Sequence, residues 1–102
     1  MKYRVLQIVV MTEFDPRLTI HREVSLGYKF FKQEYLTSYE HVADVEADGE
    51  EDAFRLLNLF DDESLINRRK PMHSLSVGDI LIDDNGVYLF CDSFGFRPFW
   101  IN

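Results

Sequence analysis

The sequence predicts an α+β domain in which a small, mostly antiparallel sheet of about four strands carries one main helix on a face. Three observations predict this fold: an apolar run opens the chain, an amphipathic segment follows an acidic stretch, and two apolar runs flank Asn85-Gly86. With 102 residues, 46% of them hydrophobic, the chain has the size of one domain. We expect residues 1–102 to fold as a single unit with its own core.

Residues 3–11 are predicted to form a strand. Val5 and Val9 lie on one side of it and Leu6, Ile8 and Val10 on the other. Because apolar side chains occupy both sides, we expect a central strand. Pro16 lacks an N–H donor and restricts the residue before it, so the strand ends before residues 12–16.

Residues 17–38 fit two patterns. Val24, Leu26, Tyr28 and Phe30 alternate with polar residues or glycine, as in a strand, whereas a helical pattern uses Val24, Tyr28, Phe31 and Tyr35. Gly27 weakens both. We favour the strand and leave the helix as the alternative.

Residues 39–47 are predicted to form a strand with Tyr39, His41, Ala43 and Val45 on one face. A helix follows, because Asp48 is a candidate N-cap and Glu51 completes a capping box. The predicted core stripe of this helix has the spacing i, i+3, i+4 and i+7, and it consists of Ala53, Leu56, Leu57 and Phe60. Phe54 and Leu59 fall off this stripe, so we expect them under a loop or against another chain.

The last third is predicted to be a hairpin that the rest of the chain covers. Residues 61–71 read as a polar connection, and strands over 80–82 and 87–90 are joined by a two-residue turn at Asn85-Gly86. Leu89 and Cys91 share one face of the second strand with Val87. Before the hairpin, residues 77–79 predict a turn that uses the freedom of Gly78, with Ser74, Ser76 and Asp79 bonding to nearby backbone. Residues 96–101 are predicted to add a short edge strand, where Pro98 is tolerated.

Several segments occur in an order that resembles a group of small bacterial, plasmid and phage proteins, including the YodL-like family. They are Tyr3-Arg-Val-Leu-Gln-Ile8, Val42-Ala-Asp-Val-Glu-Ala47, Glu51-Asp-Ala-Phe54, Asn58, Ser74-Leu-Ser-Val-Gly-Asp79 and Gly95-Phe96. The Ser-Leu-Ser-Val-Gly-Asp string is the most specific of them, and the resemblance covers residues 3–10 and 39–96. It implies a small accessory protein, often carried on a mobile element, with some members linked to sporulation and cell shape. It carries over no catalytic residue.

The formal charge of -7 is concentrated in one block, since residues 40–63 hold ten acidic residues and one basic residue. Such a block argues against broad contact with nucleic-acid phosphates and fits a basic protein partner. The interaction residues that we predict are Glu50, Glu51, Asp52, Phe54, Leu59, Asp61, Asp62 and Glu63. Solubility and helix capping explain the same charges, so this prediction competes with a structural explanation.

No catalytic, cofactor or metal constellation is expected. The free thiol of Cys91 reads as a small buried hydrophobe, and His21, His41 and His73 have no spacing of a metal motif. Ser74, Ser76, Gly78, Asp79, Asn85 and Gly86 are interpreted as a structural motif. The alternative is a small enzyme with a site at Ser74, Ser76, Asp79 and Asp92, which would require a pocket where these side chains converge.

The expected function is therefore that of a non-enzymatic accessory protein that binds another protein, in its sharpest form as a DNA-mimic inhibitor of a nucleic-acid-binding host protein. The partner is not identified by the sequence, and a homodimer is compatible with it. We expect neither direct nucleic-acid binding nor a membrane span. With one cysteine and no long apolar stretch, a cytoplasmic location is expected.

Overall fold

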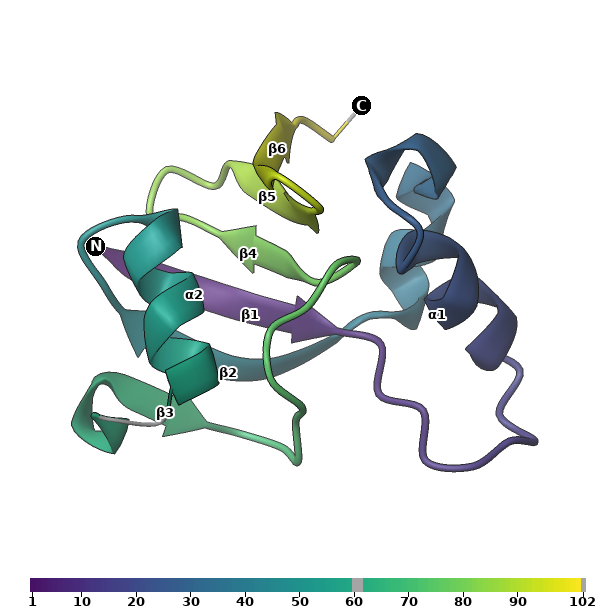
Figure 1. The fold of residues 1–102 in the computed structure, drawn as a ribbon, viewed down its shortest axis with the longest axis horizontal. Coiled ribbons are helices and arrows are strands. Elements are labelled where there is room, and N and C mark those ends of the chain that lie inside the picture. The colour runs from purple at the N-terminus through teal and green to yellow at the C-terminus, as the bar shows by residue number, and fades with distance from the viewer. Residues whose placement is uncertain (60–61, 102) are drawn as a thin grey trace.

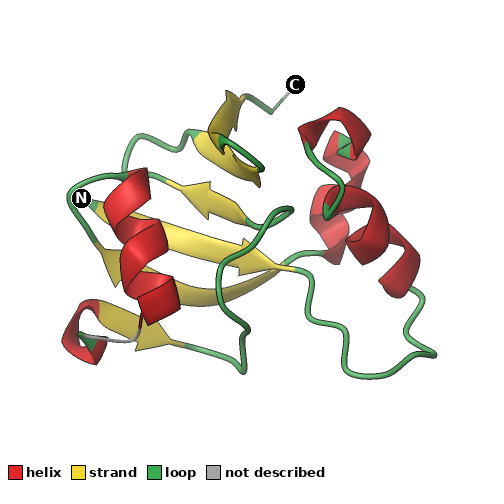
Figure 2. Ribbon diagram, in the orientation of Figure 1, coloured by secondary structure: helices red, strands yellow, loops and turns green. Residues whose placement is uncertain are grey.

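A computed structural model describes residues 1–59 and 62–101 of the chain. Figure 1 and Figure 2 show a twisted sheet with helix α2 crossing one face and a group of short helices around α1 beside the far end of strand β1. In chain order the elements are β1 (Lys2–Gln7), α1 (Leu18–Val24), the 3-10 helices η1 (Tyr28–Phe30) and η2 (Gln33–Ser38), β2 (Glu40–Glu46), α2 (Glu50–Leu59), the 3-10 helix η3 (Glu63–Leu65), β3 (Ile66–Arg68), β4 (Ile80–Ile82), β5 (Tyr88–Asp92) and β6 (Gly95–Phe99).

The strand order is β3-β2-β1-β4-β5-β6, and every neighbouring pair is antiparallel. The predicted α+β class is confirmed, although the part of the chain that the structure describes has six strands where the sequence predicts about four. Strand β1 is central, as its two apolar sides predict, but it ends at Gln7 rather than at residue 11. Within the described ranges, no helix combines the length and the apolar character that crossing a bilayer requires.

Helix α2 covers one face of the sheet with its apolar stripe. Ala53, Leu56 and Leu57 are buried, and they join Tyr3 and Val5 of β1 in one core cluster. The predicted stripe is therefore confirmed for these three residues, whereas Phe60 lies outside the described residues. Burial of these side chains is the main force that holds α2 on the sheet, because exposed helix surface contributes little to stability.

The helix begins two residues later than its predicted cap. Asp48 is not the N-cap, because α2 starts at Glu50 and its first hydrogen bond runs from the Ala53 N–H to the Gly49 carbonyl at 2.9 Å. The Asp52 carboxylate accepts a hydrogen bond from the backbone N–H of Asp48 at 3.0 Å. The Asp48 N–H therefore bonds to the side chain of Asp52, whereas the predicted capping box has Glu51 as its acceptor.

The opposite face is covered by aromatic rings from residues 17–38, and the strand predicted there is wrong. Gly27 has φ +126° and separates α1 from η1, so neither a continuous strand nor one continuous helix forms. Tyr28 and Phe31 instead pack on Phe90 with ring centroids 5.3 Å away in each case, and Phe31 also lies 5.0 Å from Phe99. Packing of these rings in the tertiary structure overrides the local alternation that favours a strand. We call residues 18–38 the α1 lobe.

A bulge in β2 changes which face two of its residues occupy. Val5 pairs with Ala43 but Leu6 pairs with His41, so Val42 is the extra residue. Val42 and Ala43 both join the core under α2, whereas His41 turns to Asp44 on the other side. The predicted shared face of Tyr39, His41, Ala43 and Val45 is therefore wrong, because strict alternation fails at the bulge.

The C-terminal hairpin is confirmed, but its turn is longer than the predicted two residues. Asp83 N–H donates to the Val87 carbonyl at 3.1 Å, and Gly86 N–H donates to the Asp83 carbonyl at 3.0 Å. Gly86 has φ +80°, as expected for the left-handed position that follows a type I turn in a three-residue loop. The Asp83 carboxylate accepts from the N–H groups of Asn85 and Val87, which fixes this loop.

Both edges of the sheet are formed by short strands. Strand β6 with Pro98 confirms the predicted C-terminal edge. Strand β3 was not predicted, since Ile66-Asn-Arg68 has no apolar alternation and pairs with β2 over only three residues. Such short strands depend on their neighbours, so sequence patterns do not reveal them.

Candidate functional site

Two side-chain amides fasten the connection from β3 to β4, residues 69–79, which we call the crossover segment. Figure 1 shows this connection passing over the end of β1 on the α2 side of the sheet. Gln7 accepts from the His73 N–H at 3.3 Å and donates to the His73 carbonyl at 3.0 Å. Asn58 of α2 does the same for Leu75, at 2.6 Å and 3.1 Å. The two amides therefore take the place of a neighbouring strand and satisfy backbone groups that would otherwise lack partners.

Asp79 ends this segment as a buried carboxyl group. Its side chain is 4% exposed, and its Oδ2 accepts from Gln7 Nε2 at 3.0 Å and from the Ser76 N–H at 2.8 Å. Burial raises the pKa of Asp79 to about 7, although His73, 3.8 Å away, and the two hydrogen bonds act in the opposite direction. The predicted turn is confirmed, since the Asp79 N–H also donates to the Ser76 carbonyl.

Gly78 is required at this turn. It has φ +102°, and a Cβ there would lie 2.9 Å from Val24 Cγ2 and 3.1 Å from the Val24 backbone. Tyr39 donates its hydroxyl hydrogen to the Gly78 carbonyl at 2.5 Å. Within the Ser-Leu-Ser-Val-Gly-Asp string, Gly78 and Asp79 are therefore explained by contacts with α1, with Tyr39 and with the sheet.

The residues of the alternative enzyme site do not converge. Ser74 and Ser76 are exposed, and the buried Asp79 carboxylate bonds to Gln7 and Ser76. Asp92 is the last residue of β5, and its carboxylate instead accepts from the N–H groups of Tyr28 and Ser93. The hollow in which Asp92 takes part contains none of the other three. This geometry favours the structural interpretation of the motif.

The remaining candidate side chains are also held by local contacts. Burial raises the pKa of the Cys91 thiol to about 12, so it stays protonated at neutral pH. The rings of His21 and His73 meet edge to face at 6.2 Å, whereas His41 lies 2.8 Å from Asp44. Within residues 1–59 and 62–101, no three metal-ligating side chains gather.

Three of the predicted acidic interaction residues have partners of their own. Asp52 pairs with Arg55 at 2.8 Å, Glu63 with Arg68 at 2.9 Å, and the Asp62 carboxylate accepts from the N–H and hydroxyl of Ser64. Asp61 lies outside the described residues. Glu50 and Glu51 are the predicted interaction carboxylates in the described ranges for which the structure gives no hydrogen bond or ion pair.

The predicted surface residues Glu51 and Phe54 line a small hollow against the last hairpin. We call it the aromatic hollow; it has a volume of about 210 Å³ and is lined by Glu51, Phe54, Cys91, Asp92, Ser93, Gly95 and Phe96. Phe54 is 36% exposed, and its ring meets that of Phe96 at 6.5 Å. Beside the hollow, Phe94 at the turn between β5 and β6 is fully exposed. Leu59, which is 63% exposed, lies at the other end of α2.

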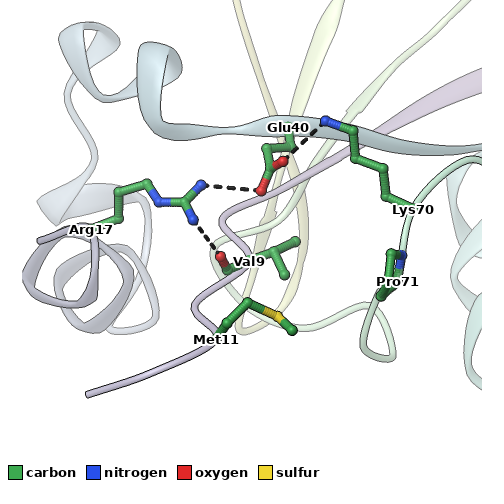
Figure 3. Close-up of a pocket in the computed structure, with 6 residues that line it drawn as sticks. All are labelled: Val9, Met11, Arg17, Glu40, Lys70 and Pro71. Carbon is green, nitrogen blue, oxygen red and sulfur yellow. Dashed lines mark hydrogen bonds and ion pairs between the residues drawn. The ribbon is translucent and has the colours of Figure 1, made fainter. Parts of the chain in front are cut away.

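A second hollow lies where β1 ends, and the charged side chains around it form ion pairs with one another. Figure 3 shows Val9, Met11 and Pro71 around it, with Arg17, Glu40 and Lys70 along its rim. Glu40 lies 3.1 Å from Arg17 and 3.0 Å from Lys70, and Arg17 donates to the Val9 carbonyl at 2.7 Å. Hydrogen bonds from Lys70 and Arg17 lower the pKa of Glu40. This network ties residues 9–17 to β2 and to the crossover segment.

A third hollow, which we call the polar hollow, lies on the sheet face opposite α2, with a volume of about 380 Å³. It is lined by Lys2, Arg4, His41, Asp44, Arg69, Ile82, Asp83, Asp84 and Gly86. None of the cationic residues here was predicted as a site. The signal was present, however, because Lys2 and Arg4 are two residues apart on a strand and therefore share a face.

Comparisons with family models, with curated proteins and with solved structures gave no match. The resemblance to YodL-like proteins therefore stays a prediction. Two residues that organise the site were not singled out for that role by the sequence, namely Gln7 and Phe96. Gln7 is the last residue of β1 and is fully buried, and a buried amide needs hydrogen-bond partners, which the crossover segment provides.

Proposed function

We propose that this protein acts without catalysis, by binding a basic segment of another protein on the surface formed by α2 and the β5–β6 hairpin. We call this surface the acidic-aromatic face and define it by Glu50, Glu51, Phe54, Phe94 and Phe96. The observation that carries the proposal is the aromatic hollow, which has two aromatic rings in its wall and carboxylates at its rim.

The aromatic rings give this face its capacity to anchor a partner. Phe54 is only partly covered by Phe96, and Phe94 has no cover at all. Exposed aromatic side chains beside a small hollow are typical of protein interfaces, where an apolar side chain of the partner fills the hollow. The volume of about 210 Å³ fits one such side chain better than a complete small-molecule ligand.

The carboxylates determine the chemistry of the partner. Glu50 and Glu51 lie at the first turn of α2, and the Glu51 Oε1 comes within 3.7 Å of where a Cβ on Gly95 would lie. Asp92 also lines the hollow, but its carboxylate is already engaged, since it accepts from the N–H groups of Tyr28 and Ser93 and lies 3.9 Å from Arg97. A partner segment with one apolar residue between Lys or Arg residues complements this arrangement, and such charges would increase its association rate.

The DNA-mimic form of the proposal has less support than recognition of a basic segment. Mimicry of a duplex needs many free carboxylates at regular spacing, whereas Asp52, Asp62 and Glu63 are engaged locally. Binding of a basic segment needs only Glu50 and Glu51 beside the aromatic rings. A mobile-element origin and a cytoplasmic location, where the single thiol would stay reduced, belong to this proposal and rest on the sequence.

The experiment is a selection of random peptides displayed on phage against the immobilised chain. We expect enriched peptides to share an apolar residue flanked by Lys or Arg. The double variant Glu50→Lys/Glu51→Lys should weaken their binding by about tenfold or more at low salt, because two attractive charges become repulsive.

The matched control is Glu13→Lys/Glu34→Lys, which makes the same charge change at two exposed residues outside this face. Binding should persist in the control. Enriched peptides without basic residues, or equal loss in both double variants, would contradict the proposal. A second copy of the chain could also occupy this face, and gel filtration of the wild type and of Phe54→Ser tests that alternative. A wild-type dimer that Phe54→Ser converts to a monomer would contradict the proposal, because the face would then serve self-association.

A further inference from the structure

The polar hollow lies on the half of the sheet face that the α1 lobe leaves bare. The lobe packs on Ile8, Ile80 and Phe90, whereas Lys2 and Arg4 at the other end of β1 are exposed. The hollow is therefore separate from the acidic-aromatic face, which lies on the other side of the sheet.

One wall of this hollow is held by a buried carboxylate. Asp44 is 4% exposed, and it lies 2.8 Å from His41 Nε2 and 2.7 Å from the Arg69 guanidinium. Both Nε and Nη2 of Arg69 are directed at the same oxygen, Oδ2. A buried carboxylate that holds two donors in this way fixes their positions before any ligand arrives.

The opposite wall carries carboxylates that already accept hydrogen bonds from backbone N–H groups. Asp83 accepts from Asn85 and Val87, each at 2.9 Å, and Asp84 accepts from the Lys2 N–H at 3.1 Å. These N–H dipoles offset part of the negative charge. Each carboxylate oxygen still has lone pairs for a hydroxyl donor.

Two cations remain for a ligand. Across the described ranges, the structure gives neither the Lys2 ammonium nor the Arg4 guanidinium an acceptor, and both residues line the hollow. An Arg guanidinium with a free donor fork binds a phosphoryl group in two parallel hydrogen bonds, and Lys adds a point charge. The carboxylates of the other wall repel a long polyanion, so a nucleic acid is a poor fit.

From this arrangement we infer that the polar hollow binds a small hydroxylated phosphate ester, such as a sugar phosphate. Lys2 and Arg4 bind its phosphoryl group, and Asp83 and Asp84 accept hydrogen bonds from its hydroxyl groups. Arg69 and His41, held by Asp44, form the wall beside the phosphoryl group.

The test is titration of the full chain with glucose 6-phosphate, followed by backbone and arginine side-chain NMR signals. We expect saturable shifts at residues 2–4 and 83–86, with Arg4→Gln weakening the binding by about tenfold or more and Arg22→Gln leaving it unchanged. Arg22 is a matched control because it is an exposed arginine on α1, away from the hollow. The spectra also establish that each variant is folded.

Three further ligands test the phosphoryl contacts, the hydroxyl contacts and the preference over nucleic acid separately. Glucose alone and inorganic phosphate alone should each bind at least about tenfold more weakly than the ester. Equal affinity for inorganic phosphate would overturn the assignment of Asp83 and Asp84 to the hydroxyl groups. Tighter binding of a DNA duplex, or no saturable shift up to about 10 mM ester, would overturn the site.

Discussion

The two faces of the sheet are covered in different ways. Under α2 the core is mostly aliphatic around the buried ring of Tyr3, and one regular helical stripe provides the cover. On the other face the cover consists of aromatic rings from the irregular α1 lobe, which also contacts the crossover segment through His21 on His73 and Val24 at Gly78. The comparison teaches that a short chain can bury a sheet without a second long helix. The requirement is that large rings fill the volume and that glycine and buried polar groups allow the backbone to approach closely.

The largest expected loss of stability comes from truncating the aromatic core, and it can be compared with a truncation under α2. Phe90→Ala removes a ring that contacts Tyr28 and Phe31, so we expect it to lower the free energy of unfolding by about 3–5 kcal/mol. Leu57→Ala under α2 is the comparison, and we expect a smaller loss because no ring pairs are lost. Urea unfolding measures both. A smaller loss at Phe90 than at Leu57 would show that the aromatic cover is not the stronger one.

Substitution of Gly78 should loosen the contact between the crossover segment and the α1 lobe. Gly78→Ala forces a side chain into a positive φ and against the Val24 backbone, with an expected cost of about 2–4 kcal/mol. Gly86→Ala is the matched control, since Gly86 also has a positive φ but nothing lies within 4 Å of its Cβ position. Its cost should be about 1–2 kcal/mol. Thermal unfolding gives the difference, and equal losses would mean that Val24 moves aside freely.

The buried Asp79 should make stability depend on pH. Because its pKa is about 7 in the folded protein and 3.8 for a free aspartate side chain, the folded state retains a proton that the unfolded state releases between these values. Stability from this group is therefore full below about pH 4 and is lost as the pH rises to about 7, by about 4 kcal/mol. Asp79→Asn should remove this loss, as urea unfolding at several pH values would show.

The neighbour His73 provides the control for this prediction. It lowers the pKa of Asp79, so His73→Gln should extend the loss of stability to higher pH. Glu40, Asp44 and Glu63 have lowered pKa values and contribute the opposite slope below about pH 4, so the informative quantity is the difference between wild type and Asp79→Asn. A difference that does not change with pH would contradict the buried neutral carboxyl group.

The smallest expected loss of stability comes from the hydrogen bonds between the crossover segment and α2. Asn58→Ala leaves the backbone N–H and carbonyl of Leu75 without their partner, so we expect a loss of about 1–2 kcal/mol. Hydrogen exchange should quicken at Leu75 while the amides of β1 stay protected. Unchanged exchange at Leu75 would show that water replaces the amide at no cost.

How much the sequence predicts depends on whether a pattern is local. The α2 stripe, the two faces of β5 and the edge position of β6 follow from side-chain periodicity and from Pro98, and all of them are found. Among the interaction residues, Phe54 was expected under a loop or against another chain, and it lies 36% exposed beside Phe96. The hollow beside it needs Phe96, which lies far along the chain, and no local pattern joins the two.

The sequence by itself determined the α+β class, the central first strand, the amphipathic helix and the final hairpin, because each depends on the spacing of apolar residues within one short segment. Only the tertiary structure decided the fold of residues 17–38, the β2 bulge, the β3 edge and the binding of the crossover segment by Gln7 and Asn58. These features depend on contacts between distant segments. There, ring packing and the need to pair every buried polar group outweigh local preference.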